Sequence, residues 1–296
     1  MKSKAVGVIG LGIMGSAMSA NLVKAGFATY GFDIAPAQRR KLEKAGGIAC
    51  KSTAEVAEKA PIVISSLPSA AALHAVTKKL LSTKRKNIIV ETSTLPIEDK
   101  VLARDTLAKK GVTLLDCPLS GTGAQARNKD LSVYASGDKA AYRKCIPVFE
   151  GFARSHYFLG EFGSGSKMKF VANLLVAIHN VAAAEGFVLG MKAGLSPKLI
   201  YEVIADGAGN SRMFQVRGPQ MVAGRYDSAM IAVELWQKDM KIIGEHATRL
   251  GVATPLFSAT IPLYNAAIAQ GFGKQDTASV CAVLENLSGV KRGRHG

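Results

Sequence analysis

A lysine and an asparagine stand four residues apart at the start of an unusually apolar helical stretch. The segment Gly163 to Asn173 reads GSGSKMKFVAN, and the apolar pattern continues to Gly194. Residues four apart share one face of a helix, so Lys169 and Asn173 would lie together on its first turns. A lysine amine can exchange a proton with a reacting group, and an amide can orient that group. The alternative for Lys169 is a surface lysine whose stem covers a helix end.

A glycine-rich turn near the N-terminus is the second candidate for chemistry. An apolar strand pattern at residues 4–9 runs into GLGIMG and then into a helix pattern that ends at Gly26. Strand, glycine turn and helix in this order are typical of dinucleotide binding, because the turn brings backbone N-H groups at a helix N-terminus close to a pyrophosphate. We therefore predict cofactor binding by Gly10, Leu11, Gly12, Ile13, Met14 and Gly15.

An acidic residue ends the next strand pattern, at residues 28–32. Asp33 has the spacing of the acid that accepts hydrogen bonds from the adenosine ribose hydroxyls. Without it, the glycine turn would indicate only a tight strand-to-helix connection. An acid at this position would repel a 2'-phosphate, so the sequence favours NAD over NADP. Arg39 and Arg40 follow in the next helix and leave NADP open.

A loop of small residues follows the strand pattern that ends at Asp116. It reads CPLSGTGAQA, from Cys117 to Ala126. Small residues allow backbone N-H groups to face a bound carboxylate or carbonyl oxygen, and a serine hydroxyl adds a donor. We place three of its residues in the candidate substrate site: Ser120, Gly121 and Thr122.

The elements that must position these residues alternate along the first half of the chain. Strand patterns at 4–9, 28–32, 61–67, 87–91 and 112–116 alternate with helix patterns, including 70–81 and 97–110. This predicts an α/β protein with a Rossmann-type doubly wound parallel sheet. Ligands bind beyond the carboxyl ends of such strands, so Leu67, Pro68 and Thr94 are cofactor candidates, with ordinary loop chemistry as the alternative. Strands at 131–136 and 155–159, around a helix at 139–149, would close this domain.

Only helical patterns follow residue 163. A long interdomain helix leads into shorter helices separated by turns near 194–197, 207–210 and 251–255. We predict a dinucleotide-binding domain at 1–163 and an all-helical domain at 164–296, which is apolar enough to support oligomers; the family resemblance described below implies that it serves substrate binding and oligomerisation. A helix at about 231–250 carries Lys238 beside Asp239, a pair that usually lies on a solvated helix face.

Composition limits the class of protein. With 48% hydrophobic and 20% charged residues over 296 positions, the chain is typical of a soluble globular protein. We expect no signal peptide and no membrane segment, and we expect a cytoplasmic location. The four cysteines have no metal-binding spacing, so no metal is predicted. The net charge of +16 suits anionic ligands or nonspecific nucleic-acid binding, but the basic clusters at 84–86 and 291–294 lack interleaved aromatic residues, and no specific nucleic-acid partner is expected.

Four segments together resemble the β-hydroxyacid dehydrogenase family. They are GLGIMGSAMSANLVKAG, DCPLSGTGAQA, GSGSKMKFVANLL and KDMKIIGEHATRLG, and they occur in the family's order over most of the chain. The family includes 3-hydroxyisobutyrate dehydrogenase, tartronate semialdehyde reductase, threonate dehydrogenase and, more distantly, 6-phosphogluconate dehydrogenase. The resemblance implies an oxidoreductase that interconverts a small β-hydroxy acid and its semialdehyde or ketone with NAD(P).

The resemblance also assigns roles to individual residues. Lys169 corresponds to the family's catalytic lysine, which acts as general acid and base, and Asn173 to its supporting amide. Ser120 and Gly121 correspond to the loop that holds the substrate carboxylate, with Ser120 counted among the catalytic residues. The implied partner is a small anionic hydroxy acid, and the implied assembly is a homodimer or homotetramer.

Two further positions match the family, and three depart from it. Lys238 matches a lysine that reaches the cofactor and the substrate, and Thr94 matches a position near the nicotinamide ribose. Thr122 stands where a second glycine is usual, and Lys129 and Asp130 replace a pair of small residues. These departures lie in the predicted substrate site, so the identity of the substrate acid cannot be inferred from other members of the family.

Two alternatives stay open from the sequence. One is a noncatalytic dinucleotide-binding scaffold, supported only by the high positive charge. The other is an NADP-dependent semialdehyde reductase of the same fold. The chain lacks the histidine-bearing pattern of 6-phosphogluconate dehydrogenase, and Lys169 speaks against the imine-reducing relatives, which lack that lysine.

Overall fold

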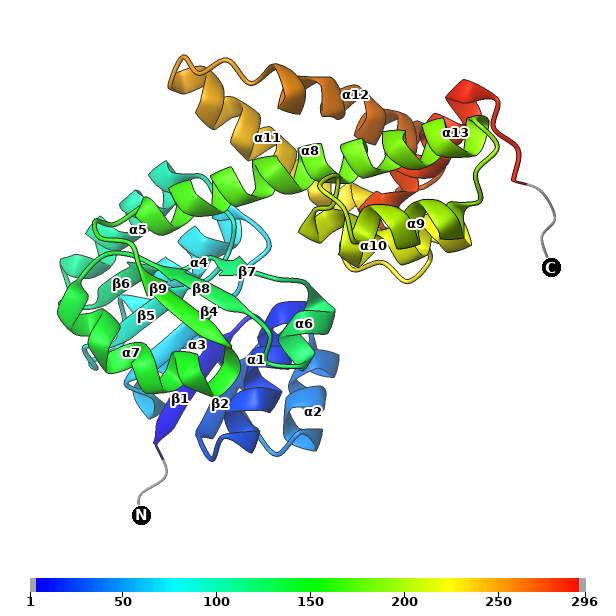
Figure 1. Ribbon diagram of the computed structural model, residues 1–296. Coiled ribbons are helices and arrows are strands. Elements are labelled where there is room, and N and C mark those ends of the chain that lie inside the picture. The colour runs from blue at the N-terminus through cyan, green and yellow to red at the C-terminus, as the bar shows by residue number, and fades with distance from the viewer. Residues whose placement is uncertain (1–3, 293–296) are drawn as a thin grey trace. The chain divides into compact units, whose positions relative to one another are not determined.

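Short runs of aliphatic residues build a parallel sheet in the first half of the chain, in a computed structural model that describes residues 4–292 (Figure 1). Six strands are hydrogen-bonded in the order β3-β2-β1-β4-β5-β6, and every pairing is parallel. The strands are β1 (Ala5–Ile9), β2 (Ala28–Phe32), β3 (Ile48–Ala49), β4 (Ile62–Ser65), β5 (Ile88–Glu91) and β6 (Thr113–Asp116). The predicted doubly wound sheet is confirmed, and its order reverses between β1 and β4, where ligands of such sheets bind.

Helices cover this sheet because its central strands are apolar on both faces. The connecting helices are α1 (Ile13–Lys24), α2 (Pro36–Lys44), α3 (Thr53–Lys59), α4 (Ala70–Leu80) and α5 (Ile97–Ala108). One core joins Val6 and Val8 of β1 to Met18 of α1, and another joins Val63 of β4 to Leu73 of α4. Burial of aliphatic side chains in two cores fixes which strand ends lie together at the carboxyl edge.

A second, smaller sheet follows β6. It contains β7 (Leu119–Ser120), β8 (Ser132–Ala135) and β9 (Ser155–Phe158), with β7 antiparallel and β9 parallel to β8. Two helices belong to this region, α6 (Gly123–Arg127) and α7 (Lys139–Phe152). A single bridge between Asp116 and Ser136 connects the small sheet to the end of β6. The sequence predicted the strands of this region at 131–136 and 155–159, but it did not predict the short β7 that pairs with β8.

The remainder of the described chain is helical. A long helix, α8 (Ser164–Lys192), is followed by α9 (Pro197–Ala205), α10 (Arg212–Ala223), α11 (Val233–Arg249), α12 (Pro255–Ala269), a 3-10 turn η1 (Thr277–Ser279) and α13 (Val280–Ser288). This confirms the predicted fold class. The compact units divide between Lys169 and Phe170, inside α8. The division expected from the sequence, 1–163 and 164–296, falls at the start of α8 and stays a prediction.

A buried ion pair organises the helical unit. Arg217 of α10 and Asp276 are 1% and 0% exposed, and Arg217 Nε donates to Asp276 Oδ1 at 3.0 Å. The Asp276 carboxylate also accepts from the backbone N-H groups of Met230 at 2.7 Å and Ala278 at 2.9 Å. One carboxylate therefore joins α10, the segment before α11 and η1, and it satisfies donors that would otherwise be buried without a partner.

Asp276→Ala is expected to lower the free energy of unfolding of the helical unit by about 3–5 kcal/mol, because it leaves the Arg217 guanidinium buried without its counter-charge. The single tryptophan, Trp236, is 2% exposed on α11, so its fluorescence reports this unit during urea unfolding. Lys198→Ala breaks an exposed pair with Glu202 and is the control, expected to change stability by less than about 0.5 kcal/mol. Equal effects of the two variants would show that the buried pair has no special role.

Candidate functional site

The glycine turn has the shape that a bound phosphate group needs. Gly10 has φ +87°, and a Cβ there would lie 2.1 Å from the carbonyl oxygen of Ser66. A Cβ on Gly15 would lie 1.8 Å from the carbonyl oxygen of Gly10, so a side chain is excluded at both positions. A Cβ on Gly12 would point into open space, with no atom from another part of the described chain within 4 Å, and no side chain caps the N-terminus of α1. The turn therefore leaves an approach to free backbone N-H groups, which fits a pyrophosphate.

Asp33, the predicted acceptor for the adenosine ribose, lies against this turn. Its Oδ2 accepts from the backbone N-H of Leu11 at 2.7 Å, and its Oδ1 accepts from that of Ala35 at 2.8 Å. Arg39 folds back from α2, donating to the carbonyl oxygen of Asp33 at 2.6 Å, with its guanidinium 5.6 Å from the centre of the Phe32 ring. An acid and a cation thus stand together at the end of β2, where the adenosine ribose is expected.

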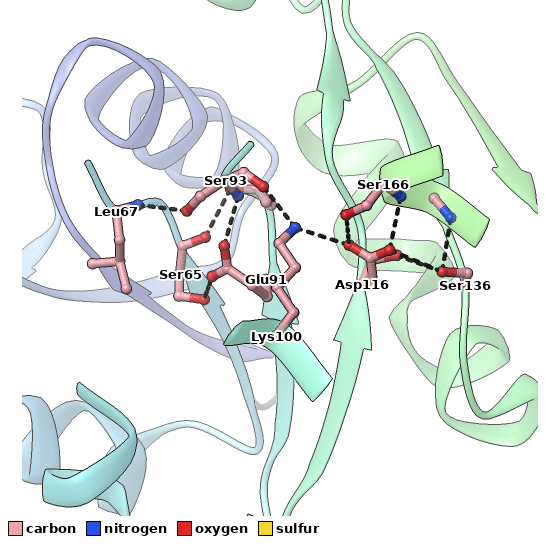
Figure 2. Close-up of polar contacts among 10 residues, drawn as sticks. Ser65, Leu67, Glu91, Ser93, Lys100, Asp116, Ser136 and Ser166 are labelled. Atoms are coloured by element: carbon pink, nitrogen blue, oxygen red, sulfur yellow. Dashed lines mark hydrogen bonds and ion pairs between the residues drawn. The ribbon is translucent and has the colours of Figure 1, made fainter. Parts of the chain in front are cut away.

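Figure 2 shows the hydrogen bonds that hold Leu67 and Ser93 beyond the ends of β4 and β5, and Thr94 follows Ser93 as a half-buried residue. Leu67 donates its backbone N-H to Ser93 Oγ at 2.8 Å, and the backbone N-H of Ser93 donates to Glu91 Oε1 at 2.8 Å. Ser65 donates its hydroxyl to the other oxygen of Glu91. Sequence reasoning missed Glu91, although a fully buried acid at the end of β5 is the kind of residue that needs partners. Pro68 follows Leu67 as an exposed residue.

The candidate substrate loop lies next to the glycine turn. A Cβ on Gly123 would lie 2.5 Å from Ile13 Cγ2, so the loop and the first residue of α1 are in close contact. Gly121 has φ +131°, a conformation that side chains other than glycine rarely adopt. Thr122 caps α6, with its backbone N-H donating to Gln125 Oε1 at 3.0 Å. Ser120, at the end of β7, is half-buried.

Lys169 and Asn173 are successive members of one face of α8. Lys169 is half-buried in the first unit. Within the helical unit, Asn173 is 4% exposed and donates from Nδ2 to Asp239 Oδ2 at 2.8 Å. The other oxygen of Asp239 lies 3.2 Å from Lys238 Nζ. Asp239 therefore connects two predicted site residues, and its side chain is only 15% exposed whereas that of Lys238 is 41% exposed.

The cysteine thiols near the site are held in the protonated form, which is a poor nucleophile. Cys117 is completely buried at the start of the substrate loop, and burial raises the pKa of its thiol well above the ordinary value. Burial likewise raises the pKa of Cys145 to about 12. Because the thiolate is the reactive form, these cysteines pack as small apolar residues. Within residues 4–292, no group of three His, Cys, Asp or Glu side chains could hold a metal ion.

Comparison with known proteins agrees with this geometry. A family model described as the NAD binding domain of 6-phosphogluconate dehydrogenase matches residues 5–160. A second, described as NAD-binding of NADP-dependent 3-hydroxyisobutyrate dehydrogenase, matches residues 163–284. The two matches together account for both units of the chain.

Individual relatives match over nearly the whole chain. L-threonate dehydrogenase of Cupriavidus necator is 31% identical, over 96% of this chain and 97% of that protein. Glyoxylate/succinic semialdehyde reductase 1 of Arabidopsis thaliana is 32% identical, over 95% and 98% respectively. The crystal structure of 3-hydroxyisobutyrate dehydrogenase from Salmonella typhimurium has a TM-score of 0.86 at 29% identity, covering 95% of this chain and 100% of that one. The chain therefore belongs to the β-hydroxyacid dehydrogenase family, as an NAD(P)-dependent oxidoreductase acting on the CH-OH group of a hydroxy acid.

Proposed function

We propose that the chain interconverts a small β-hydroxy acid and its semialdehyde or ketone, with NAD as the preferred cofactor and Lys169 as the general acid and base. The observation that carries the proposal is the contact between Gly123 and Ile13, which puts the candidate substrate loop beside the dinucleotide turn. Lys169 belongs to the same compact unit as both. A carboxylate held by this loop therefore has a hydride carrier close by.

A dinucleotide held by the glycine turn and Asp33 would supply the hydride chemistry between the carbinol and carbonyl forms of the substrate carbon. In the oxidation direction the neutral amine of Lys169 takes the hydroxyl proton as the C-H bond breaks, and in reduction its ammonium gives the proton back. Ser120 and Gly121 would hold the substrate carboxylate through a hydroxyl and a backbone N-H. Asn173 uses Nδ2 on Asp239, so its Oδ1 is the atom that would orient a donor on the substrate or on Lys169.

Two of the three departures from the family pattern, Thr122 and Asp130, form hydrogen bonds or ion pairs with other residues of the first unit. Asp130 forms an ion pair with Arg154 at 2.7 Å and accepts from Gln125 Nε2 at 3.0 Å. Gln125 also forms the capping box of α6 with Thr122. These residues hydrogen-bond to one another next to the substrate loop. We propose that they fix the conformation of the loop so that it accommodates a small acid. L-threonate is the first candidate, because a relative that matches 96% of the chain is named L-threonate dehydrogenase.

A second candidate is an NADPH-dependent semialdehyde reductase, which runs the same chemistry in the opposite direction. Two observations favour it. Arg39 is placed at the end of β2, where a guanidinium can bind a 2'-phosphate. One relative at 32% identity is named as a glyoxylate/succinic semialdehyde reductase. Comparison of the two cofactors in both directions separates the candidates, whereas the noncatalytic alternative predicts cofactor binding without turnover.

Lys169→Ala is expected to lower kcat by about 10²–10⁴-fold, because proton transfer loses its positioned group. The measurement is NADH and NADPH appearance with L-threonate, 3-hydroxyisobutyrate, 3-hydroxypropionate, glycerate, serine and 6-phosphogluconate. Lys167→Ala is the matched control, since Lys167 is an exposed lysine on the same helix. The control should retain turnover and both variants should bind NADH. Undiminished turnover by Lys169→Ala would refute the assigned acid/base.

The cofactor preference is expected to depend on the charge of Asp33. Asp33→Ser removes the anion but keeps an acceptor for a backbone N-H, so the ratio of kcat/KM for NAD to that for NADP should fall by about tenfold, equivalent to about 1.4 kcal/mol. Arg39→Ala should weaken the binding of NADPH more than the binding of NADH. Arg40→Ala alters an exposed neighbouring residue and should change the binding of neither cofactor. A wild-type enzyme that prefers NADP would contradict the role given to Asp33.

We also propose that the helical unit forms a homodimer or homotetramer with second copies of this chain. Its apolar surface supports this. Val171, Leu175 and Leu189 of α8 are 56%, 44% and 74% exposed. A groove of about 820 Å³ between α8, α9 and α10 is lined mostly by apolar and small residues, with His179 as the one titratable side chain among them. Such a surface suits an equally apolar partner, and the same face of another copy has that character.

Leu189→Lys is expected to convert the oligomer to monomers, because a charge would be buried in the contact. Sedimentation velocity gives the mass of the wild type and of the variant. Leu102→Lys changes an exposed leucine of the first unit that is 57% accessible, and it should leave the mass unchanged. A monomeric wild type would end this proposal without affecting the catalytic one.

A further inference from the structure

The carboxylate of Asp116 is a meeting point of three elements. Asp116 ends β6 and is completely buried. Its Oδ1 accepts from Lys100 Nζ at 2.8 Å and from Ser166 Oγ at 2.8 Å. Its Oδ2 accepts from the backbone N-H of Ser166 at 2.8 Å and from Ser136 Oγ at 3.3 Å (Figure 2). One buried anion thus binds the first turn of α8 to the sheet.

The surroundings explain why a charge is kept in this buried place. Lys100 of α5 is also completely buried, so the pair balances two charges that would each be unfavourable alone. The N-terminal turn of a helix has backbone N-H groups without partners and a positive dipole end. The Asp116 carboxylate satisfies one of these N-H groups in α8 and faces that positive end. A neutral residue would provide neither interaction.

Backbone packing makes the attachment of α8 rigid. A Cβ on Gly165 would lie 2.2 Å from the carbonyl oxygen of Tyr134 and 2.8 Å from that of Asp116. The backbone N-H of Gly165 also donates to Ser136 Oγ at 3.0 Å. The first turn of α8 therefore contacts β8 and the end of β6 directly, without intervening side chains. Lys169 follows Ser166 by three residues, or about 4.5 Å along the helix axis.

Lys100 extends this attachment to the cofactor side of the unit. Its Nζ donates to the carbonyl oxygen of Ser93 at 2.6 Å as well as to Asp116. Ser93 in turn accepts a hydrogen bond from the backbone N-H of Leu67 and donates its own backbone N-H to Glu91. Figure 2 shows this chain of hydrogen bonds running from the strand-end loops to the start of α8. The loops expected at the nicotinamide and the helix that carries Lys169 are therefore parts of one buried network.

We propose that Asp116, held by Lys100, is a positioning residue for Lys169: it fixes the first turn of α8 and so sets where the amine stands relative to the cofactor and substrate loops. The proposal rests on the proposed function, in which Lys169 transfers the proton. Its physical basis is that proton transfer between a base and a hydroxyl needs hydrogen-bond distance, so a shift of about 1 Å in the helix start slows turnover strongly.

The test is a double-mutant cycle between Ser166 and Lys169. Ser166→Ala removes one of the two hydrogen bonds from α8 to Asp116, and Ser164→Ala makes the same chemical change in the same turn, away from Asp116. Turnover is measured with the acid of the panel that wild type oxidises fastest. The rate is divided by the concentration of NADH-binding sites, so that unfolded protein does not lower the value. Ser166→Ala should lower kcat by about tenfold with the dissociation constant of NADH unchanged, and Ser164→Ala should lower it less than twofold.

The second arm repeats the comparison in the Lys169→Ala background, with methylamine added to keep the residual rate measurable. Ser166→Ala should have no further effect there, because a positioning residue has nothing left to position. An equal loss in both backgrounds would overturn the proposal, since the effect would not pass through Lys169. Wild-type kcat in Ser166→Ala and in the double variant Ser136→Ala/Ser166→Ala would also overturn it. Full turnover by Lys169→Ala would instead refute the proposed function, and the positioning role with it.

Discussion

The buried ion pair between Lys100 and Asp116 is the constraint on which the first unit depends. Two opposite charges inside a protein are tolerable only when each is paired and hydrogen-bonded, and this requirement fixes their neighbours. Lys100 divides its donors between Asp116 and the carbonyl oxygen of Ser93, and Asp116 completes its acceptor sites with Ser136 and Ser166. Three strand ends and the start of α8 consequently have one mutual arrangement.

On the cofactor side, the position of the glycine turn is fixed by close backbone contacts that leave no space for side chains. At Gly10 and Gly15 backbone atoms lie where a Cβ would be, so the turn and the first turn of α1 are in direct backbone contact. Asp33 then bonds to Leu11 within that turn. The unit thus positions the expected phosphate and ribose sites with backbone and one carboxylate, and it positions the expected proton-transfer site with a buried ionic network. Neither device needs a flexible surface side chain.

The sequence predicted what depends on local pattern. Alternating apolar strands and helices predicted the doubly wound sheet, and the spacing from the glycine turn to the end of the next strand singled out Asp33, because both follow from the order and length of consecutive elements. It did not predict the partners of Glu91, Asp116 and Asp239, because these lie across strands or helices and have no periodic signature. Asp239 is an example. The adjacent Lys238 suggested a solvated pair, but the Asp239 carboxylate also accepts a hydrogen bond from Asn173, which lies 66 residues away in the sequence.

Lys169 and Asn173 share one face of a single helix, α8. The compact units divide just after Lys169, yet the helix runs without interruption from Ser164 to Lys192. Residues four apart in one helix keep a fixed spacing. Lys169 is therefore held in register with Asn173 by helical geometry itself, while Asp116 fixes the start of α8 and Asp239 fixes the amide one turn later. The start of the helix before Lys169 thus has its anchor at Asp116 within the first unit, and Asn173 has its anchor at Asp239 within the helical unit, so the carboxylate that supports each predicted site residue belongs to the same unit as that residue.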